Sequence, residues 1–417
     1  MKKMLKVAAV LAAILIAFTL GACDDGSSSG SGGGGSGSGG GSGNTPSSKN
    51  PFGFTEKDNH KYFCLDKGGK VLRQVESEYE GEDVEGTVFV VYWDLTDGTG
   101  KVELCEYYGD YEDVTIPNGV TAIRSAFVGC TSVKKVTIPD SVTEIGDSAF
   151  YGCTSLASVN IPGSVTEIGE WAFRECTSLA SVTIPRGVTE IGDSAFEGCK
   201  SLASVTIPGS VTKLGDSAFW GCKSLASVTI TDGVTEIGGG AFGVCTSLAS
   251  VTIPGSVKTI GNSAFDECTS LASVTISNGV TEIGRGAFDD CTSLASVTIP
   301  GSVKTIGDSA FWGCTSLASV NILDGVTKIG RYAFYECKKL TSVTFIKQTG
   351  WHADSVSAKV TTSTSSDMVT YSEYDIEDMS DPSNNAEYLR HTSPAQPDDT
   401  TWGKKDWGAR DLYRKME

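Results

Sequence analysis

Histidine is nearly absent from this chain. The 417 residues include only His60, His352 and His391, and none of them lies between residues 114 and 346. The serines and cysteines of that region therefore have no histidine to act as a general base. There is no Cys-x-x-Cys pair for zinc, and no phosphate-binding loop or dinucleotide fingerprint. The sequence predicts a protein that is not an enzyme and that uses no cofactor or metal.

Basic residues are also scarce. The chain has 33 lysines and arginines against 51 aspartates and glutamates, which gives a formal net charge of -18. Because phosphate contacts are made by lysine and arginine, this balance argues against nucleic acid as a partner. A long apolar run is missing after residue 20. No membrane-spanning helix is therefore expected in the rest of the chain.

The one apolar run, residues 7–20, follows three lysines in the pattern of a secretory signal peptide. It ends in Leu20-Gly21-Ala22-Cys23, which resembles the lipobox of bacterial lipoproteins. The resemblance implies a signal peptide 1–22, lipid on Cys23, and attachment to the membrane through lipid chains alone. Residues 23–50 form a flexible Gly/Ser tether. We expect an exported protein at the outer membrane or cell surface, although the sequence does not decide between surface and periplasm.

Cysteine, by contrast, is abundant and regular. Ten of the thirteen cysteines recur at a constant spacing of 23 residues, and the other three are Cys23, Cys64 and Cys105. A strict period of this length indicates one structural unit copied along the chain. The ten regular positions are Cys130, Cys153, Cys176, Cys199, Cys222, Cys245, Cys268, Cys291, Cys314 and Cys337.

Each copy carries eight apolar positions, as in residues 156–178. Val159 and Ile161 alternate with polar neighbours, which is the pattern of a half-buried strand, and Pro162-Gly163 favours a turn. Eight apolar residues cannot bury one another within one coil, but stacked coils build a continuous core. The period therefore predicts a β-solenoid of about ten 23-residue coils.

Two columns of the stack have a physical interpretation. Stacked cysteines would have parallel Cα–Cβ vectors at one strand spacing, which does not suit a disulfide, so we interpret them as small buried thiols. Glycine follows the Ile168 position in nine of ten coils, which indicates a positive φ or a close approach of backbone. The first coil has Arg124 instead and is one residue short, as is typical of a capping repeat.

The unit Val-Thr-Ile-Pro-x-Ser-Val-Thr-x-Ile-Gly-x-x-Ala-Phe-x-x-Cys-x-Ser-Leu resembles the 23-residue leucine-rich repeat first described in treponemes. That repeat is shared with the BspA-like surface proteins of oral and gut bacteria. The match covers about residues 114–345 and implies a mainly β fold, a curved or gently twisted right-handed leucine-rich-repeat solenoid. Family members are typically exported surface proteins implicated in attachment to host matrix proteins, host cells or other bacteria. The resemblance supplies no shared set of binding residues.

Both ends of the chain depart from the repeat. We assign residues 51–113 to an N-terminal β cap, residues 114–346 to the solenoid, and residues 347–417 to a polar C-terminal cap or tail. In the N-terminal cap, residues 86–93 predict a strand, and residues 101–108 predict one that pairs with the first coil.

Two cysteines lie in the N-terminal cap. Cys64 and Cys105 could form a disulfide in an oxidising compartment or remain free thiols. The sequence does not distinguish these two states.

A second period, of 46 residues, lies in the turns that follow the strands. Gly-Ser turns alternate with turns whose second residue is glycine. We interpret this alternation as the duplication of coil pairs. The Gly-Ser turns begin at Gly163, Gly209, Gly255 and Gly301, and the others begin at Arg186, Asp232, Asn278 and Asp324.

Sequence variation concentrates on either side of the Ala-Phe pair, whereas the outward strand positions repeat serine and threonine. Variable loops on a constant scaffold are where recognition is usually found, and Trp, Tyr and Arg are frequent hot-spot residues. The same rings could instead cover the phenylalanine column or fill gaps. The candidate partner-binding residues are Trp171, Arg174, Trp220, Trp312, Tyr332 and Tyr335.

Acidic pairs occupy the same variable slot in two adjacent coils. These are Asp266-Glu267 and Asp289-Asp290. They could bind Ca²⁺ weakly, although such a cluster is more often a solvated face.

Lipobox, tether and solenoid together predict a lipid-anchored surface adhesin or protein-binding scaffold. Its expected partners are host extracellular matrix or bacterial surface proteins, with glycans as a variant. The alternative is a passive envelope or periplasmic lipoprotein without a specific ligand.

Overall fold

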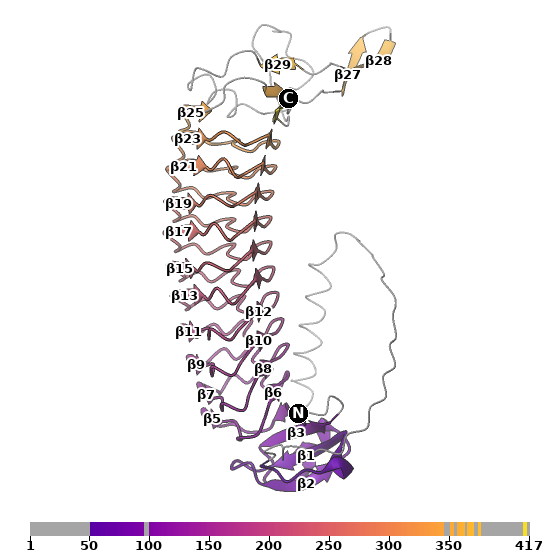
Figure 1. Cartoon of the computed structure of the whole chain (residues 1–417). Coiled ribbons are helices and arrows are strands. Elements are labelled where there is room, and N and C mark those ends of the chain that lie inside the picture. Colours follow the sequence, from indigo (N-terminus) through magenta and orange to yellow (C-terminus); the bar gives the residue numbers. More distant parts are fainter. Residues whose placement is uncertain are drawn as a thin grey trace, which may run out of the picture.

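The computed structural model describes residues 51–95 and 100–345, together with the backbone of five strands between residues 351 and 414. The chain winds into a tall column of stacked coils, with strands β1 to β3 at one end and β25 towards the other (Figure 1). The signal peptide, Cys23 and the tether predicted for residues 1–50 lie outside the described residues. Most of the predicted C-terminal cap or tail does too.

One side of the column, the strand face, contains one strand per coil. Neighbouring strands run parallel with a register offset of one coil, so that Ser181 lies opposite Ser158. The predicted mainly β solenoid is confirmed, and this face has eleven strands where about ten coils were expected. They are β5 (Asp113–Thr115), β7 (Lys135–Thr137), β9 (Ser158–Asn160), β11 (Ser181–Thr183), β13 (Ser204–Ile207), β15 (Ser227–Ile230), β17 (Ser250–Ile253), β19 (Ser273–Ile276), β21 (Ser296–Ile299), β23 (Ser319–Ile322) and β25 (Ser342–Phe345).

A second side, the short-strand face, contains one two-residue strand per coil. These strands also pair in parallel, coil on coil, as Glu167 does with Glu144 and Glu190. They are β6 (Ala122–Ile123), β8 (Glu144–Ile145), β10 (Glu167–Ile168), β12 (Glu190–Ile191), β14 (Lys213–Leu214), β16 (Glu236–Ile237), β18 (Thr259–Ile260), β20 (Glu282–Ile283), β22 (Thr305–Ile306) and β24 (Lys328–Ile329).

The alternation seen in the sequence decides which side chains enter the core. In β9, Val159 is buried between exposed Ser158 and Asn160, and the following Ile161 is buried too. Each fully buried valine or isoleucine stabilises the fold by roughly 1.5–3 kcal/mol. The buried residues of successive coils form one continuous cluster from the N-terminal cap to Phe345.

A column of phenylalanines runs through this core. From Phe127 to Phe334 the rings stack coil on coil, with neighbouring centroids 5.0 to 5.5 Å apart. The column continues into the N-terminal cap, because Tyr107 lies 4.9 Å from Phe127 and Phe89 lies 5.7 Å from Tyr107. Aromatic stacking thus joins the cap to the solenoid.

The cysteine column consists of buried free thiols, as expected. Burial raises the pKa of Cys222 to about 12. Each thiol from Cys153 to Cys337 also donates a hydrogen bond to the phenylalanine carbonyl of the preceding coil, at 3.1 to 3.3 Å. The thiols therefore link neighbouring coils in addition to filling space.

The glycine after each inward Ile position allows close approach of backbone. A Cβ built on Gly215 would lie 2.5 Å from the carbonyl carbon of Gly192 in the preceding coil. These glycines do not have positive φ, so the second of the two predicted reasons is the correct one. Arg124 is tolerated because no coil precedes its own, and its N–H donates to Leu104 of the cap at 2.9 Å.

The 46-residue period corresponds to a physical pairing of coils. From Thr231 onward, every second coil has a residue with a backbone N–H after its strand, whereas the earlier coils all have proline there. Ser277 donates to Ile253 at 3.0 Å. The coils between have proline there, which has no N–H to donate. The hydrogen-bond distances between neighbouring coils therefore alternate. Ala272 donates to Ala249 at 2.9 Å, but Ala295 donates to Ala272 at 3.3 Å. The same donor role belongs to Thr231 and Leu323.

The N-terminal cap is a small antiparallel sheet. Strand β1 (Lys61–Leu65) pairs with β2 (Val71–Val75) and β3 (Phe89–Asp94), and β3 pairs with β4 (Lys101–Tyr107). Two 3₁₀ turns, Glu56–Asp58 and Glu78–Asp83, accompany these strands. The strand predicted for residues 86–93 begins three residues later than expected, at Phe89.

Strand β4 joins the cap to the solenoid. Leu104 of β4 lies opposite Ile123 of β6 in a parallel pair, which confirms the predicted pairing onto the first coil. Cys64 and Cys105 are both free. Strand β3 separates the strands that carry them, so about two strand spacings, or roughly 10 Å, lie between their backbones. That distance exceeds the reach of a disulfide.

At the other end of the solenoid, three short strands extend the sheet of the short-strand face. Strand β30 (Leu412–Arg414) pairs antiparallel with β24 and with β26 (Trp351–Ala353), and β26 pairs with β29 (Tyr374–Ile376). A separate hairpin joins β27 (Ser357–Thr362) to β28 (Ser365–Thr370). Among the described residues, no helix is long and apolar enough to cross a membrane.

Candidate interaction surface on the turn face

The third side of each coil, which we call the turn face, is formed by the residues around Ala-Phe. In each coil the residues two before and two after the phenylalanine have positive φ, as Ser148 and Gly152 do around Phe150. Serine or glycine takes the first of these positions in most coils, but Trp171 (φ 56°) and Tyr332 (φ 57°) take it in two. A bulky residue there costs of order 1–3 kcal/mol, and such strain concentrates at functional sites.

Trp171 is accompanied by a cation. The Arg174 guanidinium lies 6.0 Å from the centre of the Trp171 ring, within range of a cation–π contact. It also pairs with Glu197 of the next coil at 2.9 Å, and both side chains of this ion pair are less than one fifth exposed. The turn face thus binds a guanidinium between an aromatic ring and a carboxylate.

Trp220 packs against its own protein. Its ring covers Gly240 and Gly243 of the next coil, where a Cβ on Gly240 would lie 3.0 Å from the ring and one on Gly243 would overlap it. The ring is half-buried by this packing. The space-filling interpretation, which the sequence left open, describes Trp220 well.

Trp312 occupies the same slot four coils later, but its neighbours are aromatic. Its ring centroid lies 5.5 Å from that of Tyr332 and 4.8 Å from that of Tyr335, and the two tyrosines are 5.7 Å apart. All three side chains are half-buried. We call this cluster the aromatic ledge. The structure therefore brings together three of the six candidate residues. Of the other three, Trp171 and Arg174 lie together in one coil and Trp220 lies in another.

A hollow of about 530 Å³ lies beside the ledge. Trp312 forms one wall, and Asn262, Arg285 and Asp289 with two serines supply polar groups. Gly286 lies between them, and a Cβ built there would lie 3.3 Å from the Ser263 hydroxyl. The sequence pointed to Trp312 and to Asp289 separately, but not to their meeting with Asn262 and Arg285, since these residues come from three different coils.

Of the two acidic pairs, Asp289 lines this hollow, and Asp266 occupies the equivalent slot of the preceding coil. Partial burial, followed by the charges of Glu267 and Asp290, raises the pKa of Asp266 to about 6. Partial burial, followed by the charges of Asp266 and Asp290, raises the pKa of Asp289 to about 7. Among the described residues, no group of three or more His, Cys, Asp or Glu side chains is arranged to hold a metal ion, so the weak Ca²⁺ site gains no support.

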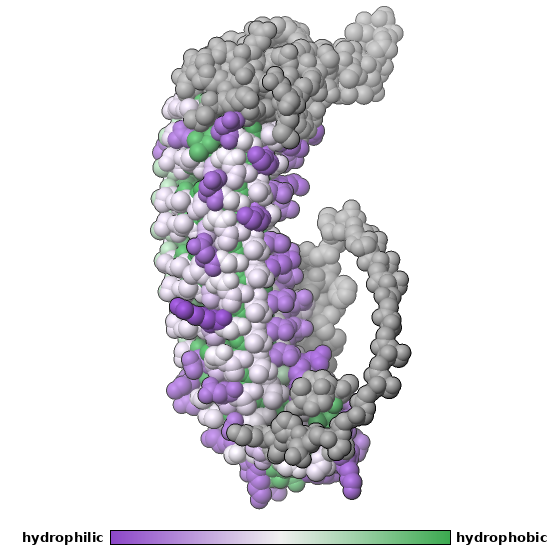
Figure 2. All heavy atoms as spheres, viewed as in Figure 1, coloured by the Kyte–Doolittle hydropathy of each residue, from purple (hydrophilic) through white to green (hydrophobic). Residues whose placement is uncertain are grey.

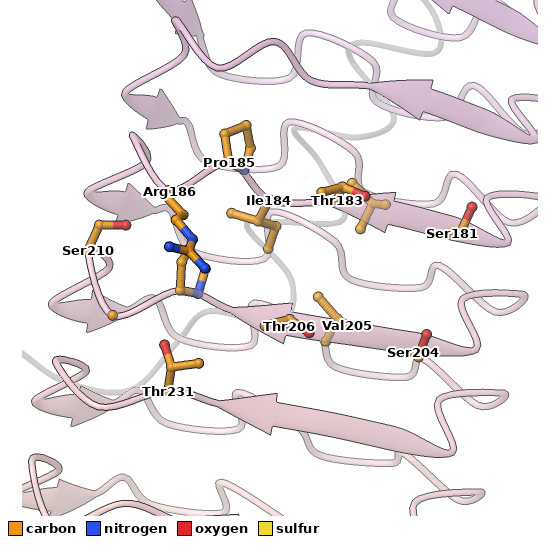
Figure 3. A pocket seen from close by; sticks show the side chains of 13 residues that line it. Ser181, Thr183, Ile184, Pro185, Arg186, Ser204, Val205, Thr206, Ser210 and Thr231 are labelled. Atoms are coloured by element: carbon orange, nitrogen blue, oxygen red, sulfur yellow. The ribbon is translucent and has the colours of Figure 1, made fainter.

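The strand face holds a second hollow, of about 860 Å³, which the sequence did not indicate. It lies between β11 and β13, which no ladder joins in the described sheets. Serine and threonine hydroxyls line it together with Arg186, whose side chain reaches towards the turn of the next coil, where Ser210 lies (Figure 3). The only sequence signal was Arg186 itself, a charged residue in a turn position that is otherwise small, acidic or an amide.

Hydrophilic residues are unevenly distributed on the surface. Figure 2 shows a column of mostly intermediate hydropathy, with hydrophilic side chains gathered along the edge formed by the short strands. Glu144, Glu167 and Glu190 lie in consecutive coils there. Partial burial, followed by the negative charges of Glu144 and Glu190, raises the pKa of Glu167. The short strands from β6 to β24 contain no aromatic residue, so this edge is a weaker candidate than the turn face.

The sequence is similar to those of known repeat proteins. A model of the BspA type leucine rich repeat region matches residues 103–226 and 217–341, in six copies. A crystal structure of a leucine-rich repeat protein from Bacteroides ovatus is 34% identical, with a TM-score of 0.55 over 61% of this chain and 69% of that one.

Two other solved structures are similar in sequence but superpose less well. A leucine rich cell surface protein from Faecalibacterium prausnitzii is 27% identical, over 62% of this chain and 93% of that one, with a TM-score of 0.33. The T. pallidum leucine-rich repeat protein is 28% identical, over 60% of this chain and 86% of that one, with a TM-score of 0.31. No curated protein matches the chain. With over half its length matched in repeated copies, the chain belongs to the BspA-type leucine-rich repeat family.

Proposed function

We propose that this chain is an exported, lipid-anchored surface protein that binds other proteins through its turn face. Leucine-rich repeat solenoids are non-enzymatic scaffolds with extended binding surfaces. The lipobox around Cys23 and the tether of residues 23–50 support an anchor that holds the solenoid away from the membrane. The expected partners are proteins of the host extracellular matrix or of other bacterial surfaces.

The aromatic ledge is the observation that supports this function best. Tryptophan and tyrosine are the residue types most enriched in binding hot spots, and here three such rings converge from two coils. Tyr332 occupies the position that has positive φ in every coil, where most coils have serine or glycine. The rings are only half-buried, so part of the aromatic surface is available to a partner.

Binding of the mature chain to immobilised host matrix and bacterial surface proteins tests the proposal. We expect saturable binding to at least one of them, and the Trp312→Ala variant should bind about tenfold more weakly or worse because a hot-spot ring is lost. Tyr79→Ala is the matched control, since Tyr79 is 58% exposed on the N-terminal cap and far from the turn face. Equal loss in both variants would contradict the choice of face.

The alternative, a passive envelope lipoprotein, predicts a different result on whole cells. A surface adhesin must be cleaved when intact cells are treated with protease, whereas a periplasmic chain is protected. Protection on intact cells, together with no saturable ligand, would favour the passive lipoprotein.

A further inference from the structure

The ledge and the acidic pairs occupy equivalent slots in four consecutive coils. The two positions after the phenylalanine hold Asp266 and Glu267, then Asp289 and Asp290, then Trp312 in successive coils, and Tyr335 follows in the next. Backbone hydrogen bonds connect these slots, since Glu267 donates to Asp289 at 2.9 Å and Asp290 donates to Trp312 at 2.8 Å. Carboxylates and aromatic rings therefore lie side by side on the turn face.

The protein shows elsewhere what such a combination binds. Four coils earlier, Arg174 lies between the Trp171 ring and the Glu197 carboxylate, at 6.0 Å from the ring centre and 2.9 Å from the carboxylate oxygen. Ring, guanidinium and carboxylate all come from the turn face of two adjacent coils. In that place the chain supplies its own cation.

Around the ledge the carboxylates of the described residues have no paired cation. Within residues 51–95 and 100–345, no lysine or arginine forms an ion pair with Asp266, Glu267, Asp289 or Asp290. Arg285 is exposed and also lines the hollow, and it pairs with none of the four. Asp266 and Asp289 are half-buried, whereas Glu267 and Asp290 are exposed. The repulsion among these carboxylates would be relieved by an incoming cation.

The hollow supplies the space for such a cation. Beside Trp220, the equivalent room is filled by the tryptophan ring, which lies on Gly240 and Gly243. Two coils later the residue in the Trp220 slot is Asp266, so no ring covers Gly286 and the hollow beside Trp312 stays open. Its volume of about 530 Å³ is large enough for one long side chain and accompanying water.

We propose that this hollow binds an arginine side chain from a basic segment of the partner protein. The inference rests on the proposed function, in which the turn face binds proteins, and it names the chemistry of the partner. A guanidinium stacks on an aromatic face and pairs with carboxylates in a fork, whereas an ammonium does so less well. Arginine is therefore preferred to lysine, and acidic segments are rejected.

A fluorescently labelled hexa-arginine peptide is the probe, and its affinity for the full mature chain is measured by polarisation. The Asp266→Asn/Asp289→Asn variant should bind it at least tenfold more weakly, and Trp312→Ala three- to tenfold more weakly. The charge-matched control, Glu190→Gln/Glu282→Gln, neutralises two exposed carboxylates on the short-strand face and should bind within twofold of the wild type. Arg285→Ala should bind more tightly, and hexa-lysine more weakly than hexa-arginine.

Equal affinity of the two double variants would overturn the proposal, because attraction would then follow the net charge alone. The Asn variant also relieves repulsion, so an unchanged or higher melting temperature shows that it is folded.

The two proposals fail separately. A protein ligand that is weakened by Trp312→Ala but not by Asp266→Asn/Asp289→Asn refutes the arginine site and leaves the binding face standing. If the peptide loses affinity in both variants but no protein ligand is found, the arginine site stands and the proposed protein-binding function is refuted.

Discussion

At the scale of single residues, the cysteine column shows how a chemically reactive residue type becomes structural. The thiols from Cys153 to Cys337 are fully buried and donate to carbonyls of the preceding coil, as Cys222 does. Their spacing was visible in the sequence, and so was their inertness, because parallel stacking excludes disulfides. The hydrogen bond to the phenylalanine carbonyl could not be foreseen, since it depends on the rotamer of each thiol and on the turn between coils.

The first prediction concerns Cys222. Replacing it with alanine removes a buried sulfur and the hydrogen bond to Phe196, so Cys222→Ala should lower the free energy of unfolding by about 1–2 kcal/mol. Urea unfolding followed by circular dichroism measures this loss. The exposed Ser201 provides the control Ser201→Ala, which should change nothing, and a Cys222→Ala protein as stable as the wild type would contradict the structural role.

The second prediction concerns Asp289 and pH. Its pKa in the folded protein, about 7, lies above the ordinary value of 3.8, so the folded state holds a proton that the unfolded state has lost. Stability should therefore fall as pH rises from about 4 to 7. The effect is on the order of 1 kcal/mol, because solvent screens a half-exposed group.

Urea unfolding at pH 5 and pH 8 measures this effect. Asp289→Asn has no carboxylate to ionise, so the variant should lose less stability than the wild type across that interval. An identical loss in both proteins would show that Asp289 does not cause it.

At the scale of elements, the alternation of apolar residues predicted the strands, and the period predicted how they stack. The pairing of coils was visible as a 46-residue period, but its cause was not. It depends on whether a backbone N–H follows the strand, as at Ser277, or a proline does. Tyr332 and Tyr335 were candidates as well, but their contact with Trp312 escaped prediction, because residues from different coils meet only once the register of the stack is known.

The third prediction tests the pairing of coils. Proline already occupies the slot of Ser277 in other coils, so Ser277→Pro should fold while losing the donor to Ile253. The loss should be about 0.5–1.5 kcal/mol, with faster amide exchange in β17 and β19. Ser277→Ala keeps the N–H and is the control. Equal stability of the two variants would mean that this bond does not hold the coils together.

At the scale of the whole molecule, the family and the fold were within reach of the sequence, while the ligand was not. The repeat specifies a scaffold, and the recognition that we propose rests on the few positions that differ between coils. The candidate surface lies in the last four coils, at the far end of the solenoid from the N-terminal cap (Figure 1).

The fourth prediction concerns the anchor. Cys23→Ala should abolish incorporation of labelled fatty acid and move the protein from the detergent phase to the aqueous phase in a partition assay. Cys105→Ala, in the N-terminal cap, should leave both properties unchanged. Retention of the label in Cys23→Ala would show that the lipobox interpretation is wrong.

The stacking of coils has a mechanical consequence. The hydrogen bonds between coils point along the column, so a pull between an anchored N-terminus and a ligand held near Trp312 would stretch them in series. Bonds loaded in this way open one coil at a time, and each coil of 23 residues would then release roughly 75 Å of chain. If a cell were attached through such a column, a sudden flow would unfold the coils one after another. The attachment would then lengthen in small steps before it broke.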